Sequence, residues 1–249
     1  MPAPVVSVDH LSLRYRLARQ RLPSLKEYAI HWLKGTLVYS DFWALSDVSF
    51  AIGKGEVLGI VGRNGAGKSS LLKVIAGVLE ATQGTVRVDG RIAPILQLGT
   101  GFDPELTGRE NIFLNGLLLG RPRREIRERV DAIIDFSELG DFIHSPIRAY
   151  SSGMLGRLGF SIATAWIPEV LILDEIFAAG DAAFTRKCER RVAEFRAAGS
   201  TILVVSHAPH QILENCSRCI WLDHGRLLAD GAPTEILDAY HQSTLEAAG

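Results

Sequence analysis

The sequence predicts an α/β fold in which short buried strands alternate with helices. Residues 57–61 form an apolar run that suits a buried parallel strand, and helical spacing follows over residues 69–76. A second apolar run, residues 170–173, ends at two adjacent acids. The chain has 249 residues, of which 47% are hydrophobic and 22% are charged, and this composition supports one large domain or two modest ones.

Charge and hydropathy argue against several broad classes of protein. The net charge is −1, so nothing global favours nucleic-acid binding, although residues 14–34 are locally basic. No apolar run reaches the roughly 18 residues that a membrane span needs, and the N-terminus lacks the layout of a signal peptide. We therefore expect a soluble, cytoplasmic chain.

The cysteines indicate packing rather than chemistry. Cys188, Cys216 and Cys219 are too few for a disulfide framework and suit a reducing compartment. Cys216 and Cys219 form a C-x-x-C pair, but a zinc site would need a second ligand pair, which the neighbouring sequence lacks. We interpret this spacing as incidental packing.

A glycine-rich segment joins the first apolar run to the helical run. It reads GRNGAGKS and matches G-x-x-x-x-G-K-S, the P-loop, in which missing β-carbons let backbone amides surround phosphate oxygens. Lys68 is expected to reach the β- and γ-phosphates of a nucleotide, and Ser69 to offer a hydroxyl to Mg²⁺ at the positive end of the helix. The predicted nucleotide-binding residues of this segment are Gly62, Arg63, Asn64, Gly65, Ala66, Gly67, Lys68, Ser69 and Ser70. Kinases, GTPases, helicases and transport ATPases share this loop, so the reaction must be inferred from other residues.

Polar residues at two other strand ends add to this chemistry. Asp174, at the carboxyl end of a predicted strand, would stand beside the P-loop and hold Mg²⁺ directly or through water. Glu175 would point to the opposite side of the strand end, where a general base could activate a water. The next apolar run, TILVVSHAP, ends in Ser206 and His207. His207 could donate to the γ-phosphate or be an ordinary surface or core residue, and the residues alone leave both interpretations open.

A serine-rich segment before the acidic strand carries a family resemblance. The sequence YSSGMLGRLGFSIATA, residues 150–165, resembles the LSGGQ signature of ATP-binding-cassette (ABC) ATPases, and the other motifs occur in the order that the family has. The resemblance covers nearly the whole chain and implies a head-to-tail homodimer, with ATP held between the P-loop of one subunit and the signature of the other. Ser151 and Gly153 would then contact the γ-phosphate across the interface, at a predicted helix N-terminus, and Ser152 between them is a further predicted nucleotide-binding residue. Two positions depart from the family pattern, because Ser152 replaces a glycine and Met154 replaces a glutamine.

Three further site residues are carried over from the family. Gln97 stands where the family has the Q-loop glutamine that senses Mg²⁺, and Asp181 ends the D-loop in a segment, AAGD, that departs from the usual SALD. Tyr15 occupies the place of the aromatic that stacks on adenine, with Tyr39, Phe42 and Trp43 as alternatives. The predicted catalytic residues are Glu175, His207, Gln97 and Asp181, and the predicted Mg²⁺ ligands are Ser69, Gln97 and Asp174.

The resemblance implies one ABC ATPase domain over residues 1–249. Residues 1–103 and 166–249 would form the catalytic core, with a mixed sheet and an antiparallel β subdomain. Residues 104–165 would form a helical subdomain that carries the signature. Residues 17–41 are an insertion between the first two predicted strands.

The insertion contains an amphipathic helix in PSLKEYAIHWLKG. Ser24 and Glu27 have capping-box spacing, and Gly35 supplies the left-handed exit. With FWALSDVSF and YSSGM, the insertion resembles the ATPase subunits of bacterial polysaccharide exporters of the O-antigen, capsule and teichoic-acid group. That resemblance implies a peripheral subunit at the cytoplasmic face of the inner membrane, with separate transmembrane permease subunits and no nucleic-acid partner. A lipid-linked polysaccharide would be admitted near the inserted helix, whose basic and aromatic residues suit a membrane interface.

Alternatives remain open at this point. The inserted helix could fold onto its own domain instead of gating a membrane partner. The chain could be a soluble ABC ATPase of DNA repair or translation, although it has neither a long coiled-coil insertion nor a second cassette. It could also serve a different exported substrate, or act as a regulatory module without catalysis, which Glu175 and His207 argue against.

Overall fold

The computed structural model describes residues 3–18, 39–96, 99–174, 181–206 and 208–246. The predictions that concern the inserted helix, Gln97, Glu175 and His207 fall on residues outside this described part. None of the described helices has the length and apolar character that a membrane crossing requires.

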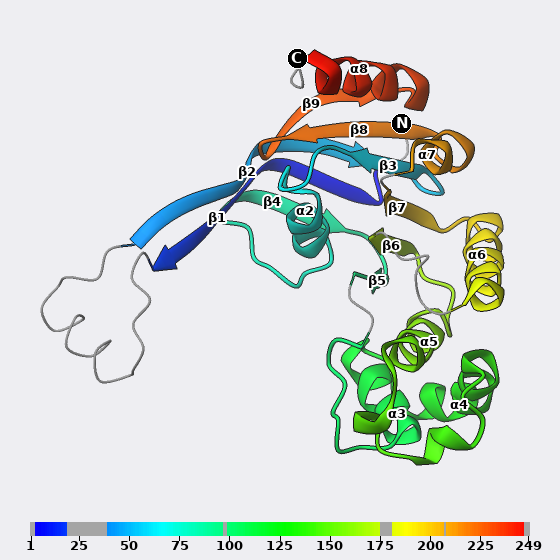
Figure 1. Cartoon of the computed structure of the whole chain (residues 1–249). Coiled ribbons are helices and arrows are strands. Elements are labelled where there is room, and N and C mark those ends of the chain that lie inside the picture. The colour runs from blue at the N-terminus through cyan, green and yellow to red at the C-terminus, as the bar shows by residue number, and fades with distance from the viewer. Residues whose placement is uncertain (1–2, 19–38, 97–98, 175–180, 207, 247–249) are drawn as a thin grey trace, which may run out of the picture.

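Two β-sheets form the upper part of the molecule in Figure 1. The smaller one is antiparallel, in the order β2 (Tyr39–Ile52), β1 (Val6–Ala18) and β4 (Gln83–Val88). Among the described residues the larger sheet has six strands, in the order β5 (Ile92–Ile95), β6 (Val170–Asp174), β7 (Thr201–Val205), β3 (Val57–Val61), β8 (Arg218–Asp223) and β9 (Arg226–Gly231). The first five are parallel and β9 is antiparallel to β8, so the predicted mixed sheet is confirmed.

The register of the larger sheet brings three strand ends together. Val205 of β7 pairs with Ile60 of β3 on one side and with Asp174 of β6 on the other. All five residues of β3 are buried, which explains its unbroken apolar sequence. The segment that follows β3 and the acid that ends β6 therefore lie at one edge of the sheet.

The helices form two groups. The sheets carry α2 (Lys68–Ile75), α6 (Ala182–Ala197), α7 (Pro209–Asn215) and α8 (Pro233–Glu246). A second group comprises α3 (Gly108–Leu118), α4 (Arg123–Ser137), η1 (Gly140–His144), η2 (Ile147–Ala149) and α5 (Ser152–Ala163). Figure 1 shows this second group gathered away from the sheets, with α5 nearest to them, and it has a hydrophobic cluster of its own.

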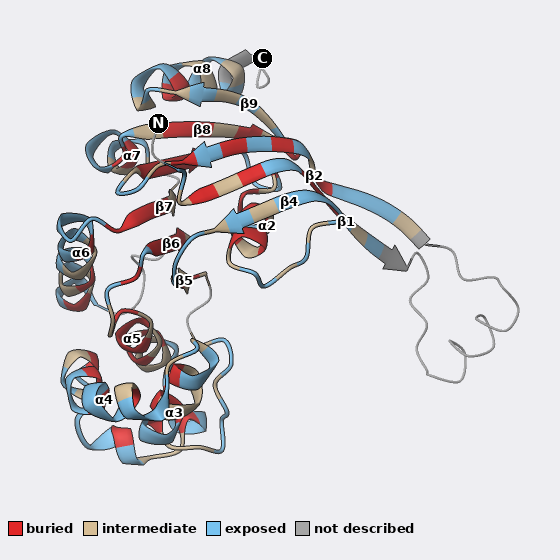
Figure 2. Ribbon diagram, turned by 180° about the vertical axis from the view of Figure 1, so that it is seen from behind, coloured by how far each residue is buried: buried red, intermediate tan, exposed pale blue. Residues whose placement is uncertain are grey.

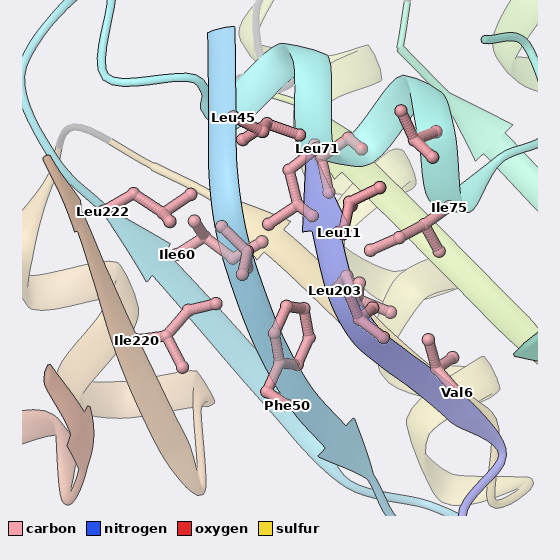
Figure 3. Close-up of a cluster of buried hydrophobic side chains, with 14 of the residues drawn as sticks. Val6, Leu11, Leu45, Phe50, Ile60, Leu71, Ile75, Leu203, Ile220 and Leu222 are labelled. Carbon is pink, nitrogen blue, oxygen red and sulfur yellow. The ribbon is translucent and has the colours of Figure 1, made fainter. Parts of the chain in front are cut away.

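The main hydrophobic cluster lies between the two sheets and α2. Figure 3 shows side chains of β1, β2, β3, β7, β8 and α2 pointing into it, and Leu11, Leu45 and Leu71 are completely buried. Burying a leucine side chain contributes on the order of 1.5–3 kcal/mol. The same packing therefore stabilises the core and fixes β2, β3 and α2 around the segment that joins β3 to α2.

A second cluster covers the opposite face of the larger sheet, and Figure 2 shows how burial concentrates on the strands between these layers. It contains Phe160, Phe184 and Phe195, together with the free thiols of Cys188, Cys216 and Cys219. Burial raises the pKa of all three thiols to about 12. These cysteines are therefore apolar packing residues, in agreement with the sequence-based interpretation.

Candidate nucleotide-binding site

Three glycines of the loop between β3 and α2 have positive φ, and a side chain would collide with the backbone at two of them. The angles are +151° at Gly62, +81° at Gly65 and +104° at Gly67. A β-carbon on Gly62 would lie 2.2 Å from the Leu222 carbonyl oxygen, and one on Gly67 would lie 2.6 Å from the Ala44 carbonyl oxygen. The loop therefore presses directly against the backbones of β8 and β2, which is why side chains are missing there.

Lys68 is folded back onto this loop. It is only 8% exposed, and its ammonium group donates to the Gly62 carbonyl at 2.6 Å and to the Arg63 carbonyl at 3.0 Å. Burial lowers the pKa of Lys68, and the carboxylate of Asp174 opposes that shift. Gly67, the N-cap of α2, supplies no side-chain cap, so the first amides of the helix stay available to an anion.

A cavity of about 450 Å³ opens above the loop. Its lining combines aromatic, loop and acidic residues: Tyr15, Phe42, Ala44, Asn64, Gly65, Ala66, Gly67, Lys68, Ser69, Ser70, Leu96, Asp174 and Val205. Most of the predicted P-loop residues thus meet Tyr15 and Asp174 around one space. Arg63 is not among the lining residues of this cavity, and its guanidinium donates to the Ser243 carbonyl of α8 at 3.2 Å.

Two of the four aromatic candidates for adenine stacking border this cavity. Tyr15 places its hydroxyl 3.4 Å from the Ser70 hydroxyl, and Phe42 lies exposed at the edge. Trp43 does not line the cavity, and the Arg14 guanidinium lies over its ring at 5.5 Å from the centroid. The side chain of Tyr39 lies outside the described part of the structure.

The cavity has a donor set that fits a hard cation. The Ser69 hydroxyl and the Asp174 carboxylate both line it, and Mg²⁺ prefers a few such oxygen ligands together with phosphate and water. The described residues hold no group of three or more His, Cys, Asp or Glu that could bind a metal by themselves. A metal carried mainly by a nucleotide is compatible with both observations.

The serine-rich segment lies at a second cavity, of about 630 Å³. Ser151 is the N-cap of α5 and accepts a hydrogen bond from the Met154 amide at 3.2 Å. The lining residues come from η1 and its junction with α4, from the start of α5 and from the N-cap of α6: Glu138, Leu139, Phe142, Ser151, Ser152, Gly153, Met154, Arg157 and Asp181. Among the described residues the two cavities share no lining residue, so the structure brings Ser151, Ser152, Gly153 and Asp181 together but not with the P-loop of the same chain.

A tyrosine anchors the wall of the second cavity. Tyr150 is buried, and its hydroxyl donates to the Phe142 carbonyl at 2.5 Å. A β-carbon at Gly108 would lie 2.4 Å from that hydroxyl, so the glycine at the start of α3 makes room for it. Phe142 is held in this way at the edge of the cavity with its ring exposed.

Sequence reasoning missed Arg157, Glu138 and Phe142. Arg157 donates to Glu138 at 3.1 Å and to Asp181 at 2.6 Å. Its signal in the sequence was helical spacing, because Arg157 follows Gly153 by one turn and so lies on the same face of α5. Glu138 and Phe142 gave no comparable signal, since only the fold brings them to the cavity.

Comparisons with known proteins agree on one family. The sequence model described as "ABC transporter" matches residues 45–178. The chain is 46% identical over 246 residues to the O-antigen export system ATP-binding protein RfbB of Klebsiella pneumoniae, covering 96% of this chain and 98% of that protein. It is 38% identical over 237 residues to the teichoic acids export ATP-binding protein TagH of Staphylococcus haemolyticus (strain JCSC1435), covering 95% and 88%. A dimeric post-hydrolysis structure of the ATP-binding cassette MJ0796 bound to ADP and Pi has the same fold, with a TM-score of 0.71, 22% identity, and coverage of 92% of this chain and 98% of that chain.

Proposed function

This chain belongs to the ABC transporter family, and we propose that it is the ATP-hydrolysing subunit of an exporter that moves lipid-linked polysaccharide across the cytoplasmic membrane. The two relatives described above are ATP-binding proteins of export systems, one for O-antigen and one for teichoic acids. The family and the relatives together support an ATPase that works with separate membrane subunits.

One observation carries the proposed mechanism: the phosphate loop and the signature line two separate cavities. If both contact one ATP, the second half of each site must come from another copy of the chain. A head-to-tail homodimer meets this requirement, and the fold relative MJ0796 is itself dimeric.

In the first cavity the chain's own groups bind and orient the triphosphate. The loop amides and the N-terminus of α2 would surround the β- and γ-phosphates. The ammonium of Lys68 would exchange its two carbonyl acceptors for phosphate oxygens, which would raise its lowered pKa again. Tyr15 would stack on the base.

Ser69 and Asp174 would hold Mg²⁺, which neutralises charge on the phosphates when it is bound. We assign the general base to Glu175, hydrogen bonding to the γ-phosphate to His207, and sensing of the metal to Gln97. These three residues keep the roles that the family resemblance implies. Across the dimer interface Ser151, Ser152 and Gly153 would donate to the γ-phosphate from the start of α5.

The proposed location is the cytoplasmic face of the inner membrane, where a permease would bind two copies of the chain. We assign the inserted segment, residues 17–41, to the mouth of that permease, where the lipid-linked substrate would enter.

Replacing Arg19, Arg21 and Lys26 by glutamate should impair export and leave basal ATP hydrolysis unchanged. The amount of surface polysaccharide on complemented cells measures export, and phosphate release by the purified chain measures basal ATP hydrolysis. Unchanged export in the triple variant would contradict this role of the insertion.

Mixing two inactive variants tests the shared site. Lys68→Met removes the phosphate contact and Ser151→Arg blocks the signature, so each alone should be inactive. A mixed dimer contains one site in which both halves are intact. An equal mixture should therefore recover about a quarter of the wild-type rate, since half of the dimers are mixed and each has one working site. Full activity of Ser151→Arg alone, or no recovery on mixing, would contradict the head-to-tail site.

A further inference from the structure

We propose that Arg157 is a positioning residue that joins the signature segment to the start of α6, so that Ser151 and Asp181 reach a partner's nucleotide as one unit. The inference rests on the proposed function, because the second cavity would receive the nucleotide bound to another copy of the chain.

The Arg157 guanidinium bridges two carboxylates from different elements. Its Nη1 donates to Glu138 Oε2, just after α4, at 3.1 Å, and its Nη2 donates to Asp181 Oδ2, just before α6, at 2.6 Å. The donors of arginine lie in a rigid planar fork, so one side chain fixes both carboxylates relative to α5.

Stacking holds this bridge in a defined geometry. The Arg157 side chain is 19% exposed, and its Cζ lies 5.0 Å from the centroid of the Phe184 ring. Phe184 is completely buried and packs edge-on against Phe136 and Phe160. The guanidinium therefore lies on a closely packed part of the core, and this stacking fixes its position, whereas its two carboxylate partners are more exposed, at 47% for Glu138 and 61% for Asp181.

Asp181 links this bridge to the backbone of α6. Its other oxygen, Oδ1, accepts from the amides of Ala183 and Phe184, each at 2.9 Å, and so caps the helix. Mainly these amides, and then Arg157, hold the pKa of Asp181 below its ordinary value, so the carboxylate is ionised at neutral pH. Ser151 caps α5, the helix that carries Arg157. One guanidinium thus connects the two helix starts that face the second cavity.

A second ion pair, between Lys187 and Glu138, indicates which helices would separate if Arg157 were lost. Lys187 of α6 donates to Glu138 Oε1 at 2.7 Å and lies 4.6 Å from the centroid of the Phe136 ring. This contact joins α4 to α6 without involving α5. Without Arg157, α4 and α6 would stay joined, whereas the signature end of α5 would lose its connection to Asp181.

The test compares Arg157→Gln with Arg191→Gln. Arg191 also stacks on an aromatic ring, 4.4 Å from the Phe136 centroid, and also joins α6 to α5, donating to the Thr164 carbonyl at 2.8 Å. Its side chain is 27% exposed, which is similar to Arg157. Unlike Arg157, it contacts the C-terminal end of α5 and is not among the residues that line the second cavity. Both variants should lower the melting temperature similarly, which separates a loss of stability from a loss of positioning.

Three readouts distinguish positioning from a general structural role. Arg157→Gln should lower kcat about 10- to 100-fold, since an ångström of misplacement is enough for such a loss. The affinity of the single chain for a fluorescent ATP analogue should stay within about twofold, because the P-loop is untouched. In a Glu175→Gln background, ATP-dependent dimerisation measured by light scattering should fall. Arg191→Gln should retain both kcat and dimerisation.

Arg157→Lys serves if the glutamine variant fails to fold. A lysine keeps the charge and the aliphatic stem but reaches only one carboxylate at a time, so kcat should fall without a drop in melting temperature. Equal kcat in the Arg157→Gln and Arg191→Gln variants of an active chain, or a loss confined to ATP affinity, would overturn this inference alone. A wild-type chain that neither hydrolyses ATP nor dimerises would overturn the proposed function together with it.

Discussion

Replacing Gly67 by alanine tests how the phosphate loop is held. Gly67 has φ +104°, which a residue with a β-carbon adopts only at a cost of about 1–3 kcal/mol. The new methyl group would also lie 2.6 Å from the Ala44 carbonyl oxygen and 3.0 Å from Leu45 Cδ2. Because a backbone atom cannot rotate away, β2 or α2 must shift, and such overpacking costs about 1–3 kcal/mol more.

Gly77 provides the matched control. It follows α2 with φ +72°, and a β-carbon there would meet no atom within 4 Å. Gly77→Ala therefore carries the backbone strain without the collision. In a domain of this size each kcal/mol changes the melting temperature by roughly 2–4 °C, so Gly67→Ala should melt roughly 2–12 °C below Gly77→Ala.

Thermal melts with and without ATP and Mg²⁺ measure both consequences. A ligand present at about 100 times its Kd adds about 2.7 kcal/mol of stability, so the wild type and Gly77→Ala should melt several degrees higher with ATP. Gly67→Ala should not respond, because its displaced loop no longer presents the amides. Equal melting temperatures for the two variants, or a full response of Gly67→Ala to ATP, would refute the reasoning.

Three further predictions follow from the site and the core. Tyr15→Ala should raise the Kd for ATP about 2- to 10-fold, since aromatic stacking contributes roughly 0.5–1.5 kcal/mol, and Phe42→Ala should change it less; calorimetry showing the opposite order would assign the base to Phe42. Burial lowers the pKa of Lys68 from 10.5, so the charged group costs stability at neutral pH and this cost disappears as the pH rises through its folded-state pKa. Without nucleotide, the melting temperature of Lys68→Met minus that of the wild type should therefore become smaller from pH 7 to pH 10. A difference that grows with pH would contradict the burial of this lysine. The three cysteines, each with its pKa raised to about 12, should react with a thiol reagent at pH 8 only after denaturation, and fast labelling of the native chain would contradict their packing.

Local chemistry made much of the first cavity predictable. A buried strand, a glycine-rich turn and a helix follow one another in the sequence, so residues 62–70 could be identified without tertiary information. Asp174 could be placed beside them because parallel strands end at the same edge of a sheet, and its register with Val205 agrees with that expectation. The roles of these residues toward ATP and Mg²⁺ stay predictions until binding is measured.

The second cavity was only partly predictable, because it depends on contacts between distant segments. Ser151 gave a signal as a helix cap within a signature-like motif. Glu138 gave no signal, since it is an acid that follows a charged helix. It meets Arg157 only because α4 and α5 pack together. The pairing of Gly108 with the Tyr150 hydroxyl is equally invisible in sequence, because a glycine at a helix start has many possible explanations.

The separation of the two cavities has a consequence for when ATP is consumed. In the proposed dimer, free chains at low concentration meet rarely, so hydrolysis by the unbound pool falls steeply with dilution. A permease that holds two copies side by side would replace that encounter with an effective concentration in the millimolar range. ATP hydrolysis would then occur mainly in chains that are bound to the permease, and no separate inhibitor of the unassembled subunits would be needed.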